Sequence, residues 1–476
     1  MRKMSQKIMA GVCCLTLFCG IAACGSAEKE TIGKNNGPEA TVTEAPTKTP
    51  EGEMPTKAPE ATATTAPTKA PEAAVTVAPT KAPEATVAPT KAPEPEGTIM
   101  EAAEKLGFSF GTGASAYGIR DLTYRMMLMD DFNSITATNE MKAYSLLDQK
   151  ASQWSSDGMP VMNYTQADSI VSLAELLGIG VRGHVLVWDA YMSDWFFREG
   201  YTNDGAYVDS ETMKIRLQYY IEKVITHFET EFPGVVYCWD VVNEAVGDSP
   251  SDYDGSDARH IRTLRSGVKN QFYYIIGPDY VELSFLYAKD TVEKLKKADP
   301  NVSITLFYND YNTFFPEKRD AICALVESIN SYAKDANGNY RKLCEGVGMQ
   351  SYIGGYGVQE GCMNPEDIER IREAVQKYHS LGVEVHVTEM AVRNYDKELE
   401  AEHAEFYGKL FEMYAELNSE ETLITNISIW GLNDNPWMDE NNYSYKMNGP
   451  YCGLFDEDYK KKDAYYKVLE ALQQAE

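Results

Sequence analysis

From about residue 104 onward, short apolar, β-branched segments alternate with longer stretches whose apolar residues recur every three or four positions. The first pattern predicts strands buried on both faces, as in a parallel sheet, and the second predicts amphipathic helices. The predicted strands are Phe108–Ser115, Phe132–Asn139, Gly180–Trp188, Val235–Glu244, Ser303–Asp310, Gly346–Tyr352, Val383–Glu389 and Ile427–Leu432. The helical patterns include Tyr164–Leu177, Glu211–Phe228, Asp279–Ala298, Pro365–Leu381 and Lys460–Gln474.

Repeated strand-then-helix units predict an α/β fold, a (β/α)8 TIM barrel that forms a single domain over residues 104–476. The alternative is an open, doubly wound sheet, which usually carries a glycine-rich phosphate loop after its first strand. Gly111-Thr112-Gly113 follows that pattern only in part, because no third glycine stands in register. We therefore favour the barrel.

The N-terminus has the form of a secretory signal. Basic residues precede an apolar run, Ile8–Ala23, that is too short to span a membrane comfortably. The run ends in Ile21-Ala22-Ala23-Cys24-Gly25, which resembles the bacterial lipobox. We expect a lipoprotein signal peptide over residues 1–23 and a lipid anchor on Cys24. The alternative is an ordinary signal peptide followed by a chance cysteine.

Residues 24–103 have the composition of a linker. No Phe, Tyr or Trp occurs from Glu28 to Gly107, and 12 of the 21 prolines lie between Pro38 and Pro95. The phrase Thr-Lys-Ala-Pro-Glu occurs four times. Such a segment cannot bury enough apolar surface to offset its chain entropy, so we expect a disordered spacer between the anchor and the domain.

The net charge and the spacing of cysteine and histidine restrict the classes of ligand, metal and partner that the protein could bind. The net charge of −28 argues against nucleic acid or an anionic membrane surface as a target and favours a neutral ligand. The cysteines of the body lack CxxC spacing and the histidines lack ligand spacing, so we predict no metal site and no cofactor. We expect a monomer at the bacterial cell surface, outside the cell, that contacts the membrane only through its N-terminal lipid.

Polar and aromatic residues gather where the predicted strands end. Any one of them could be a helix cap or a buried residue with satisfied hydrogen bonds. Their joint occurrence at the carboxyl ends of most strands indicates the active-site face of a barrel. They are Asn139, Lys142, His184, Trp188, Asp189, Asn243, Glu244, Asn309 to Asn312, Gln350, Tyr352, Glu389, Trp430 and Asp434.

Two of these strand ends are glutamates. The segments Trp239–Glu244 and His386–Glu389 are each an apolar run that ends in a carboxylate. They are far apart in sequence, so only the fold can bring them together. A pair of carboxylates is what cleavage of a glycosidic bond requires.

The order of motifs resembles glycoside hydrolase family 10, the (β/α)8 endo-xylanases. The resemblance covers the body from about Phe108 to Leu469. The matching segments are Asn139-Glu140-Met141-Lys142, Arg182–Trp188, Trp239–Glu244, Tyr308–Asn312, Gly346–Gln350, Val387–Glu389 and Ile429–Gly431.

This resemblance implies retaining, endo-acting hydrolysis of β-1,4-xylosidic bonds in xylan, with Glu244 as the acid/base and Glu389 as the nucleophile. It also implies that Asn243 binds the 2-hydroxyl of the bound sugar. Asn139 and Lys142 would hold the next sugar on the non-reducing side, Trp430 and Trp437 would cover the glycone sugars, and Tyr311 and Asn312 would lie toward the leaving group. The other expected substrate-binding residues are His184, Trp188, Gln350 and Tyr352.

The chain departs from the family pattern mainly on the glycone side. Thr138 replaces a glutamate, Asp189-Ala190-Tyr191 replaces His-Ser-Gln, and Tyr352 and Ala391 replace a histidine and an aspartate that support the nucleophile. The joint loss of this last pair indicates a rebuilt support. We expect the Tyr352 hydroxyl to donate to Glu389 in place of the histidine.

Three functions therefore remain open. The first is an ordinary xylanase, the second a β-1,4-glycanase of the same family with altered specificity, and the third a catalytically weak, polysaccharide-binding surface lipoprotein. Retention of both glutamates argues against the third. Of two long loops, we expect Asn435–Pro450 to form an aromatic cleft wall, whereas Gly247–Gly277 has no assigned role.

Overall fold

The computed structural model describes residues 94–354, 363–437 and 448–475. The predicted signal peptide, the predicted lipidation site Cys24 and most of the predicted linker lie outside these residues, as does most of the Asn435–Pro450 loop. The chain divides into two units, Met1–Thr86 and Val87–Glu476, and the fold below is that of the second.

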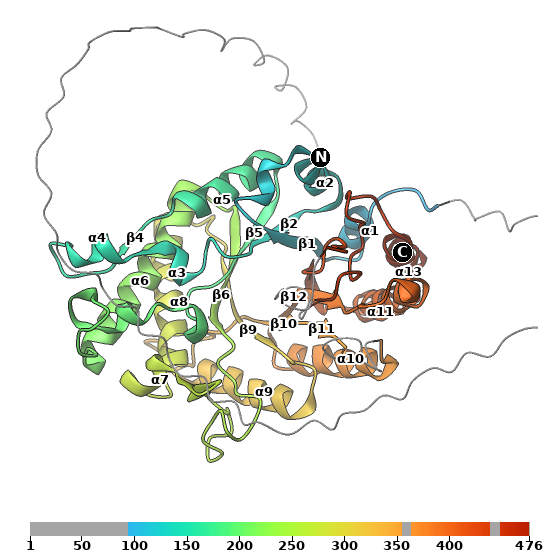
Figure 1. Ribbon diagram of the computed structural model, residues 1–476. Coiled ribbons are helices and arrows are strands. Elements are labelled where there is room, and N and C mark those ends of the chain that lie inside the picture. The colour runs from blue at the N-terminus through green and yellow to red at the C-terminus, as the bar shows by residue number, and fades with distance from the viewer. Residues whose placement is uncertain (1–93, 355–362, 438–447, 476) are drawn as a thin grey trace, which may run out of the picture. The chain divides into compact units, whose positions relative to one another are not determined.

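Eight parallel strands in the described residues close into a barrel (Figure 1). Each pairs with the next along the chain, and the last pairs with the first, which closes the ring. In chain order they are β1 (Ser109–Ala114), β2 (Ser134–Ala137), β5 (Gly180–Gly183), β6 (Val236–Asn243), β9 (Thr305–Tyr311), β10 (Gly346–Gln350), β12 (Glu384–Val392) and β13 (Ile424–Ile429).

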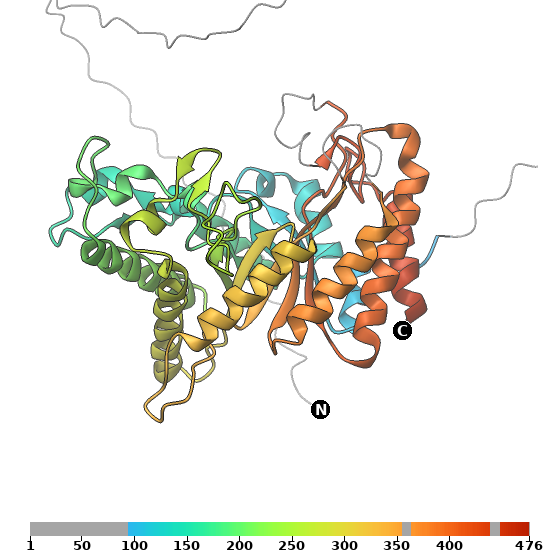
Figure 2. The same cartoon turned by 90° about the horizontal axis from the view of Figure 1, so that it is seen from below.

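Helices follow the strands and surround the barrel. Figure 2 shows the yellow and orange helices α9, α10 and α11 standing side by side against it. This order confirms the (β/α)8 barrel and excludes the open sheet. The main helices are α2 (Leu122–Asp131), α5 (Thr165–Leu177), α6 (Ser210–Glu231), α8 (Tyr280–Ala298), α9 (Pro316–Ser331), α10 (Pro365–His379), α11 (Glu400–Glu420) and α13 (Asp463–Ala475).

Shorter elements occupy the loops. Of these, β11 extends the sheet beside β12, whereas β3–β4 and β7–β8 form two separate antiparallel pairs. The short elements are α3 (Ala143–Leu146), β3 (Leu147–Asp148), α4 (Gln149–Gln153), β4 (Val161–Met162), β7 (Leu264–Arg265), β8 (Val268–Lys269), α7 (Gln271–Ile275), β11 (Tyr352–Ile353) and the 3-10 turns η1 (Gly118–Arg120), η2 (Asp189–Tyr191), η3 (Asp194–Phe197), η4 (Glu199–Tyr201) and η5 (Lys397–Leu399).

Every barrel strand differs from its predicted range by at least one residue, and β5 and β13 show the causes most clearly. β5 ends at Gly183, after which the chain continues beside β6 in a shifted register, with Val187 N–H donating to the Val241 carbonyl at 3.0 Å. β13 begins at Ile424, earlier than predicted, because polar residues inside it hid the strand pattern. Asn426 is buried, and its amide donates to the Ser109 hydroxyl at 2.8 Å.

The folded body begins before residue 104, so the predicted domain boundary was drawn too late. Helix α1 (Ile99–Lys105) opens with a capping box between Thr98 and Glu101. Its residues Ile99, Ala102 and Ala103 are buried, and the Ile99 N–H donates to the Tyr465 hydroxyl of α13 at 3.1 Å. A helix with so few large apolar side chains is hard to separate from the alanine-rich linker before it.

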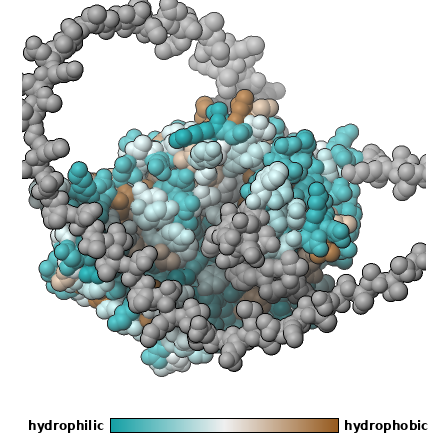
Figure 3. All heavy atoms as spheres, viewed as in Figure 1, coloured by the Kyte–Doolittle hydropathy of each residue, from teal (hydrophilic) through white to brown (hydrophobic). Residues whose placement is uncertain are grey.

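No helix in the part of the chain that the structure describes has the length and apolar character needed to cross a bilayer. The face shown in Figure 3 is largely hydrophilic, with hydrophobic side chains in small separate patches. Four body cysteines, Cys238, Cys323, Cys344 and Cys452, are buried free thiols, whereas Cys362 lies outside the described residues.

The close packing of Gly183 inside the barrel leads to a prediction about stability. A Cβ atom there would lie 2.4 Å from Cδ2 of the fully buried Trp239 indole on the neighbouring strand. Gly183→Ala should therefore destabilise the fold by about 1–3 kcal/mol through overpacking, measured by urea denaturation. Gly255→Ala is the matched control, since no atom lies within 4 Å of a Cβ at that position. Equal stability of the two variants would contradict this packing account.

Candidate active site

The two predicted catalytic glutamates lie at the same end of the barrel, although β12 continues to Val392, so that Glu389 lies inside its strand and not at its end. Glu244 directly follows β6 and adopts φ +55°, and its N–H donates to the Asn309 carbonyl at the end of β9 at 2.9 Å. Glu389 lies on β12. They are only 7% and 8% exposed, so both carboxyls are held in a largely dehydrated setting.

Gln350, at the end of β10, reaches the end of β6, two strands away in the barrel. Its side-chain amide donates to Asn243 Oδ1 at 3.1 Å and to Glu244 Oε1 at 3.2 Å. Asn309 also donates to Asn243 Oδ1, at 2.9 Å. These bonds fix the orientation of Asn243 and leave its own amide hydrogens without a hydrogen-bond partner among the described residues. A buried, unpaired donor of this kind is suited to a sugar hydroxyl.

The pKa of Glu244 is raised above its ordinary value. Burial is the main cause, and the negative charges of Asp310 and Glu389 act in the same direction. Arg265 and Lys318 oppose the shift. A carboxyl whose proton is retained in this way can act as a general acid near neutral pH.

Glu389 accepts a hydrogen bond from Tyr352, as the sequence predicted. The Tyr352 hydroxyl lies 2.6 Å from Glu389 Oε2, and Tyr352 is the register partner of Ala391 on β12. The two family departures thus face each other across adjacent strands. On the other side of the carboxylate, His184 Nε2 lies 4.0 Å from Glu389 Oε1.

A buried chain of polar groups beneath the nucleophile holds His184 in place. Asp240 Oδ2 lies 2.9 Å from His184 Nδ1, and Arg182 makes two hydrogen bonds to the same carboxylate, at 2.8 and 3.1 Å. Burial disfavours the charge on Asp240, but the Arg182 guanidinium outweighs it and lowers the pKa of Asp240 to about 2. Nδ1 of His184 is thus directed toward Asp240, and Nε2 faces Glu389.

His386 packs inside strand β12. It is buried, stacks on Phe307 with ring centroids 4.1 Å apart, and accepts a hydrogen bond from Arg182 Nε at 3.0 Å. Burial and the Arg182 charge lower its pKa well below the usual value. His386 is therefore neutral and structural.

The predicted glycone side is a cluster of aromatic rings around a buried lysine. Lys142 Nζ lies 3.3 Å from Asn139 Oδ1, 5.1 Å from the Trp188 ring centroid and 4.5 Å from that of Tyr191. The Trp188 and Tyr191 rings lie 4.3 Å apart, and Tyr144 packs on Tyr191. The residue that departs from the family pattern, Tyr191, thus fills space beside Lys142.

The two predicted platform tryptophans differ in exposure. Trp430 is half-buried and packs over Gly113, where a Cβ would lie 3.1 Å from Trp430 Cζ3. Trp437 is 87% exposed and stands at the edge of a stretch outside the described residues, which includes Tyr443 and Tyr445.

Tyr311 and Asn312 lie toward the Gly247–Gly277 loop. The Tyr311 hydroxyl hydrogen-bonds with Asp248 and accepts from Arg262 Nη2 at 3.2 Å. Asn312 adopts φ +55° and lines a pocket together with Asp248 and Lys318. Tyr311 is thus bound into an ionic network of the protein itself.

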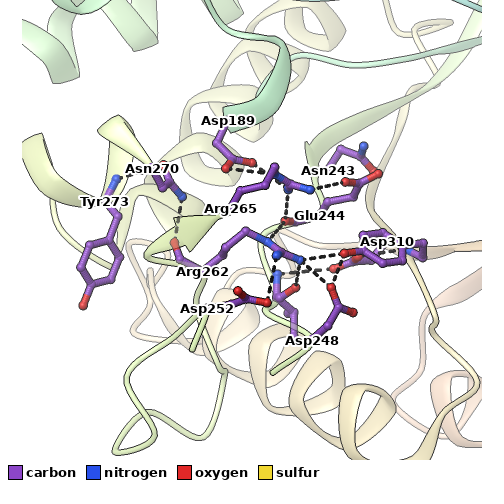
Figure 4. Close-up of polar contacts among 12 residues, drawn as sticks. Asp189, Asn243, Glu244, Asp248, Asp252, Arg262, Arg265, Asn270, Tyr273 and Asp310 are labelled. Atoms are coloured by element: carbon purple, nitrogen blue, oxygen red, sulfur yellow. Dashed lines mark hydrogen bonds and ion pairs between the residues drawn. The ribbon is translucent and has the colours of Figure 1, made fainter. Parts of the chain in front are cut away.

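The loop that had no assigned role supplies a direct partner of the predicted acid. Arg265, on β7, reaches Glu244 with Nη1 lying 2.8 Å from Oε2, and it also binds Asp189 (Figure 4). The sequence analysis did not single out Arg265, and it noted Asp189 only as a departure from the family pattern on the glycone side. The one available signal was the change from acidic to basic residues along the loop.

Comparison with known proteins identifies the family. The sequence profile of Glycosyl hydrolase family 10 matches residues 98–471. The chain belongs to this family. It is 34% identical over 353 residues to endo-1,4-beta-xylanase A of Thermotoga maritima, covering 72% of this chain and 28% of that protein. It is 30% identical over 385 residues to an endo-1,4-beta-xylanase of Geobacillus stearothermophilus, covering 78% of this chain and 98% of that one.

Solved structures of the family show the same fold. The CBM22–GH10 modules of an endo-1,4-beta-D-xylanase from Clostridium thermocellum, complexed with xylohexaose, match with a TM-score of 0.66 and 26% identity. The match covers 80% of this chain and 69% of that one. The chain spans only about a quarter to a half of the length of the first curated relatives, which are larger proteins.

The Tyr352–Glu389 hydrogen bond predicts an effect on catalysis. Tyr352→Phe removes a hydrogen bond to a charged group, worth about 1.5–3 kcal/mol, so turnover of a glycoside substrate should fall about tenfold or more. The control is Tyr201→Phe, which removes a hydroxyl that donates to the Gly158 carbonyl at 2.8 Å, away from the two glutamates. An unchanged kcat in Tyr352→Phe would rule out this role.

Proposed function

We propose that this protein is a retaining endo-1,4-β-xylanase that cleaves xylan by double displacement. The observation that carries the proposal is the pairing of two buried glutamates in unlike environments, Glu244 with its pKa raised and Glu389 with a hydroxyl donor at 2.6 Å. Both belong to motifs that match the family. The xylanase names of the aligned relatives support the substrate class.

In the first step, the Glu389 carboxylate attacks the anomeric carbon. The bond from that carbon to the leaving oxygen breaks, and Glu244 gives its proton to that oxygen. The raised pKa of Glu244 suits it to this task, while the Tyr352 hydroxyl donates to Glu389 Oε2 and orients that carboxyl.

In the second step, Glu244, now ionised, takes a proton from water as the water oxygen attacks the anomeric carbon. The ester bond to Glu389 breaks, and both carboxyls return to their starting states. The product keeps the β configuration because two inversions occur. The amide of Asn243 is suited to the sugar 2-hydroxyl, a contact that strengthens toward the transition state.

Two observations favour altered specificity within the same reaction. Tyr191 packs into the Lys142 cluster at the position where the family has glutamine, and Thr138 stands where it has a glutamate. Both changes replace hydrogen-bonding side chains expected to contact sugar hydroxyls. Rates on plain xylan, decorated xylans, glucan and mannan would distinguish an ordinary xylanase from a glycanase with shifted preference.

We also propose that the protein is held at the outer cell surface by a lipid on Cys24. Some 70 residues of proline-rich linker, at about 3.1 Å each, would let the domain reach on the order of 200 Å from the membrane. The large negative charge suits a domain that does not adhere to an anionic membrane surface.

Replacing the two glutamates should reduce activity in different ways. Glu389→Ala should remove activity on all substrates, whereas Glu244→Ala should lose about 10²–10⁴-fold on xylan and much less on an aryl glycoside whose leaving group needs no proton. Glu384→Ala, an exposed glutamate on the same strand β12, is the control. Reducing-sugar release measures xylan cleavage, and early NMR spectra show the anomer formed. An α-anomeric first product would contradict the mechanism.

Cys24→Ala should release the protein into the medium, or leave it unprocessed, while the wild type sediments with membranes and partitions into detergent. The control is Cys13→Ala, in the apolar run of the signal. Wild-type protein recovered from the medium with an unmodified N-terminus would contradict the anchor.

A further inference from the structure

Arg265 donates hydrogen bonds to two different groups of Glu244, the predicted acid. Its Nη1 lies 2.8 Å from Glu244 Oε2, and its Nη2 lies 3.0 Å from the Glu244 backbone carbonyl. The side chains of Arg265 and Glu244 are 21% and 9% exposed. The contact is therefore a largely buried ion pair, which salt screens less than a pair on the surface.

Asp189 orients the same guanidinium from the opposite side. Arg265 Nη2 lies 2.9 Å from Asp189 Oδ1, and Nε lies 3.3 Å from Oδ2. Asp189 directly follows Trp188 and starts the 3-10 turn η2. It stands where the family pattern has a histidine, so this departure in sequence lies in direct contact with Arg265 (Figure 4).

The hairpin that carries Arg265 is itself fixed to the backbone around Glu244. Arg262 donates to the Glu244 carbonyl at 3.2 Å and to the Val246 carbonyl at 2.7 Å. The Asn270 side chain donates to the Arg262 carbonyl at 3.0 Å. Arg265 thus approaches the acid from a supported position, as a preorganised group must.

We propose that Arg265, held by Asp189, is a positioning residue that fixes the Glu244 carboxyl and balances its charge between the two halves of the reaction. The proposal rests on the xylanase mechanism above. When Glu244 is ionised after the first step, the guanidinium stabilises it and keeps it aimed. When Glu244 must carry a proton, the negative charge of Asp189 offsets the positive charge of Arg265. The Arg265–Asp189 pair is then neutral as a whole.

The charged surroundings of Glu244 come from several elements. Asp310 on β9 and Glu389 on β12 raise its pKa, whereas Arg265 on β7 and Lys318 on α9 lower it. Lys142 and Tyr191 also interact with the charge of Glu244. Of the groups that lower the pKa, Arg265 has the largest effect, and the structure pairs it directly with the carboxyl.

The test is a pH profile of kcat/KM on xylan for two variants with opposite expected shifts. The alkaline limb reports deprotonation of the acid in the free enzyme. Arg265→Gln removes an opposing charge and should move this limb up by about one pH unit or more. Asp189→Asn frees the cation to act on Glu244 alone and should move it down. A residue that only supports the fold would not produce opposite shifts.

Lys269→Gln, an exposed cation on the neighbouring strand β8, is the control and should leave the profile unchanged. If Arg265→Gln fails to fold, the downward shift in Asp189→Asn still decides the matter. The proposal would be overturned if the alkaline limb of the pH profile did not move in either variant, or if it moved in the same direction in both.

A direct titration separates this proposal from the function on which it rests. The carboxyl carbons of glutamate, labelled with ¹³C in the full chain, can be followed by NMR, with Glu244→Gln assigning the signal. The titration midpoint of Glu244 should rise in Arg265→Gln and fall in Asp189→Asn whether or not xylan is cleaved. Absence of xylan cleavage by the wild type would refute the function alone, and an unmoved midpoint would refute the role of Arg265.

Discussion

The active site depends on one buried ion pair, Arg182 with Asp240, on neighbouring strands of the barrel. Both side chains are almost fully buried, and two hydrogen bonds join them. A buried charge is tolerated only when its partner and its remaining hydrogen bonds are supplied, and here His184 and His386 supply them. Removing one partner would leave an uncompensated charge in the barrel. Because Asp240 also binds His184 Nδ1, the same ion pair directs His184 Nε2 toward Glu389.

Glu244 and Glu389 carry the same carboxyl group, and their different neighbours suit them to different roles. Glu389 accepts a hydrogen bond from Tyr352 and lies 4.0 Å from His184 Nε2, so its carboxyl is held in one orientation. Glu244 is buried close to other carboxylates, which favours the proton, while Arg265 limits that effect. Different environments for two equal groups are the general means by which one site holds an acid and a base together.

Much of the barrel could be predicted from the sequence because parallel strands are buried on both faces. Residues 385–392 of β12, for example, are all buried, and Val385, Val387 and Val392 are among the apolar residues that mark this strand. The prediction was wrong in detail where polar side chains lie inside, as with Asn426 of β13, since hydrophobicity alone cannot reveal a buried polar residue whose hydrogen bonds are satisfied.

The site could be predicted where a side chain lies at a strand end, because the strand fixes its direction. Glu244 and Gln350 are of this kind, and Glu389, with its Tyr352 hydrogen bond, lies near the end of β12. Arg265 could not be predicted, because its position depends on how a hairpin distant from β6 folds back over the strand end. Asp189 was noticed as a departure, but its partner, and hence its role, is visible only in three dimensions.

The cations behind the predicted acid share one arrangement. Arg265 lies between Glu244 and Asp189, Lys318 lies between Asp248 and Asp310, and each contact is 2.8 or 2.9 Å. A cation held by two carboxylates contributes charge locally while its donors are already engaged. It therefore orients the catalytic carboxyl without offering a binding site for an anionic group. A site built in this way is suited to a neutral polysaccharide, the proposed substrate, whose hydroxyls need donors such as Asn243, and this suitability is compatible with the acidity of the chain.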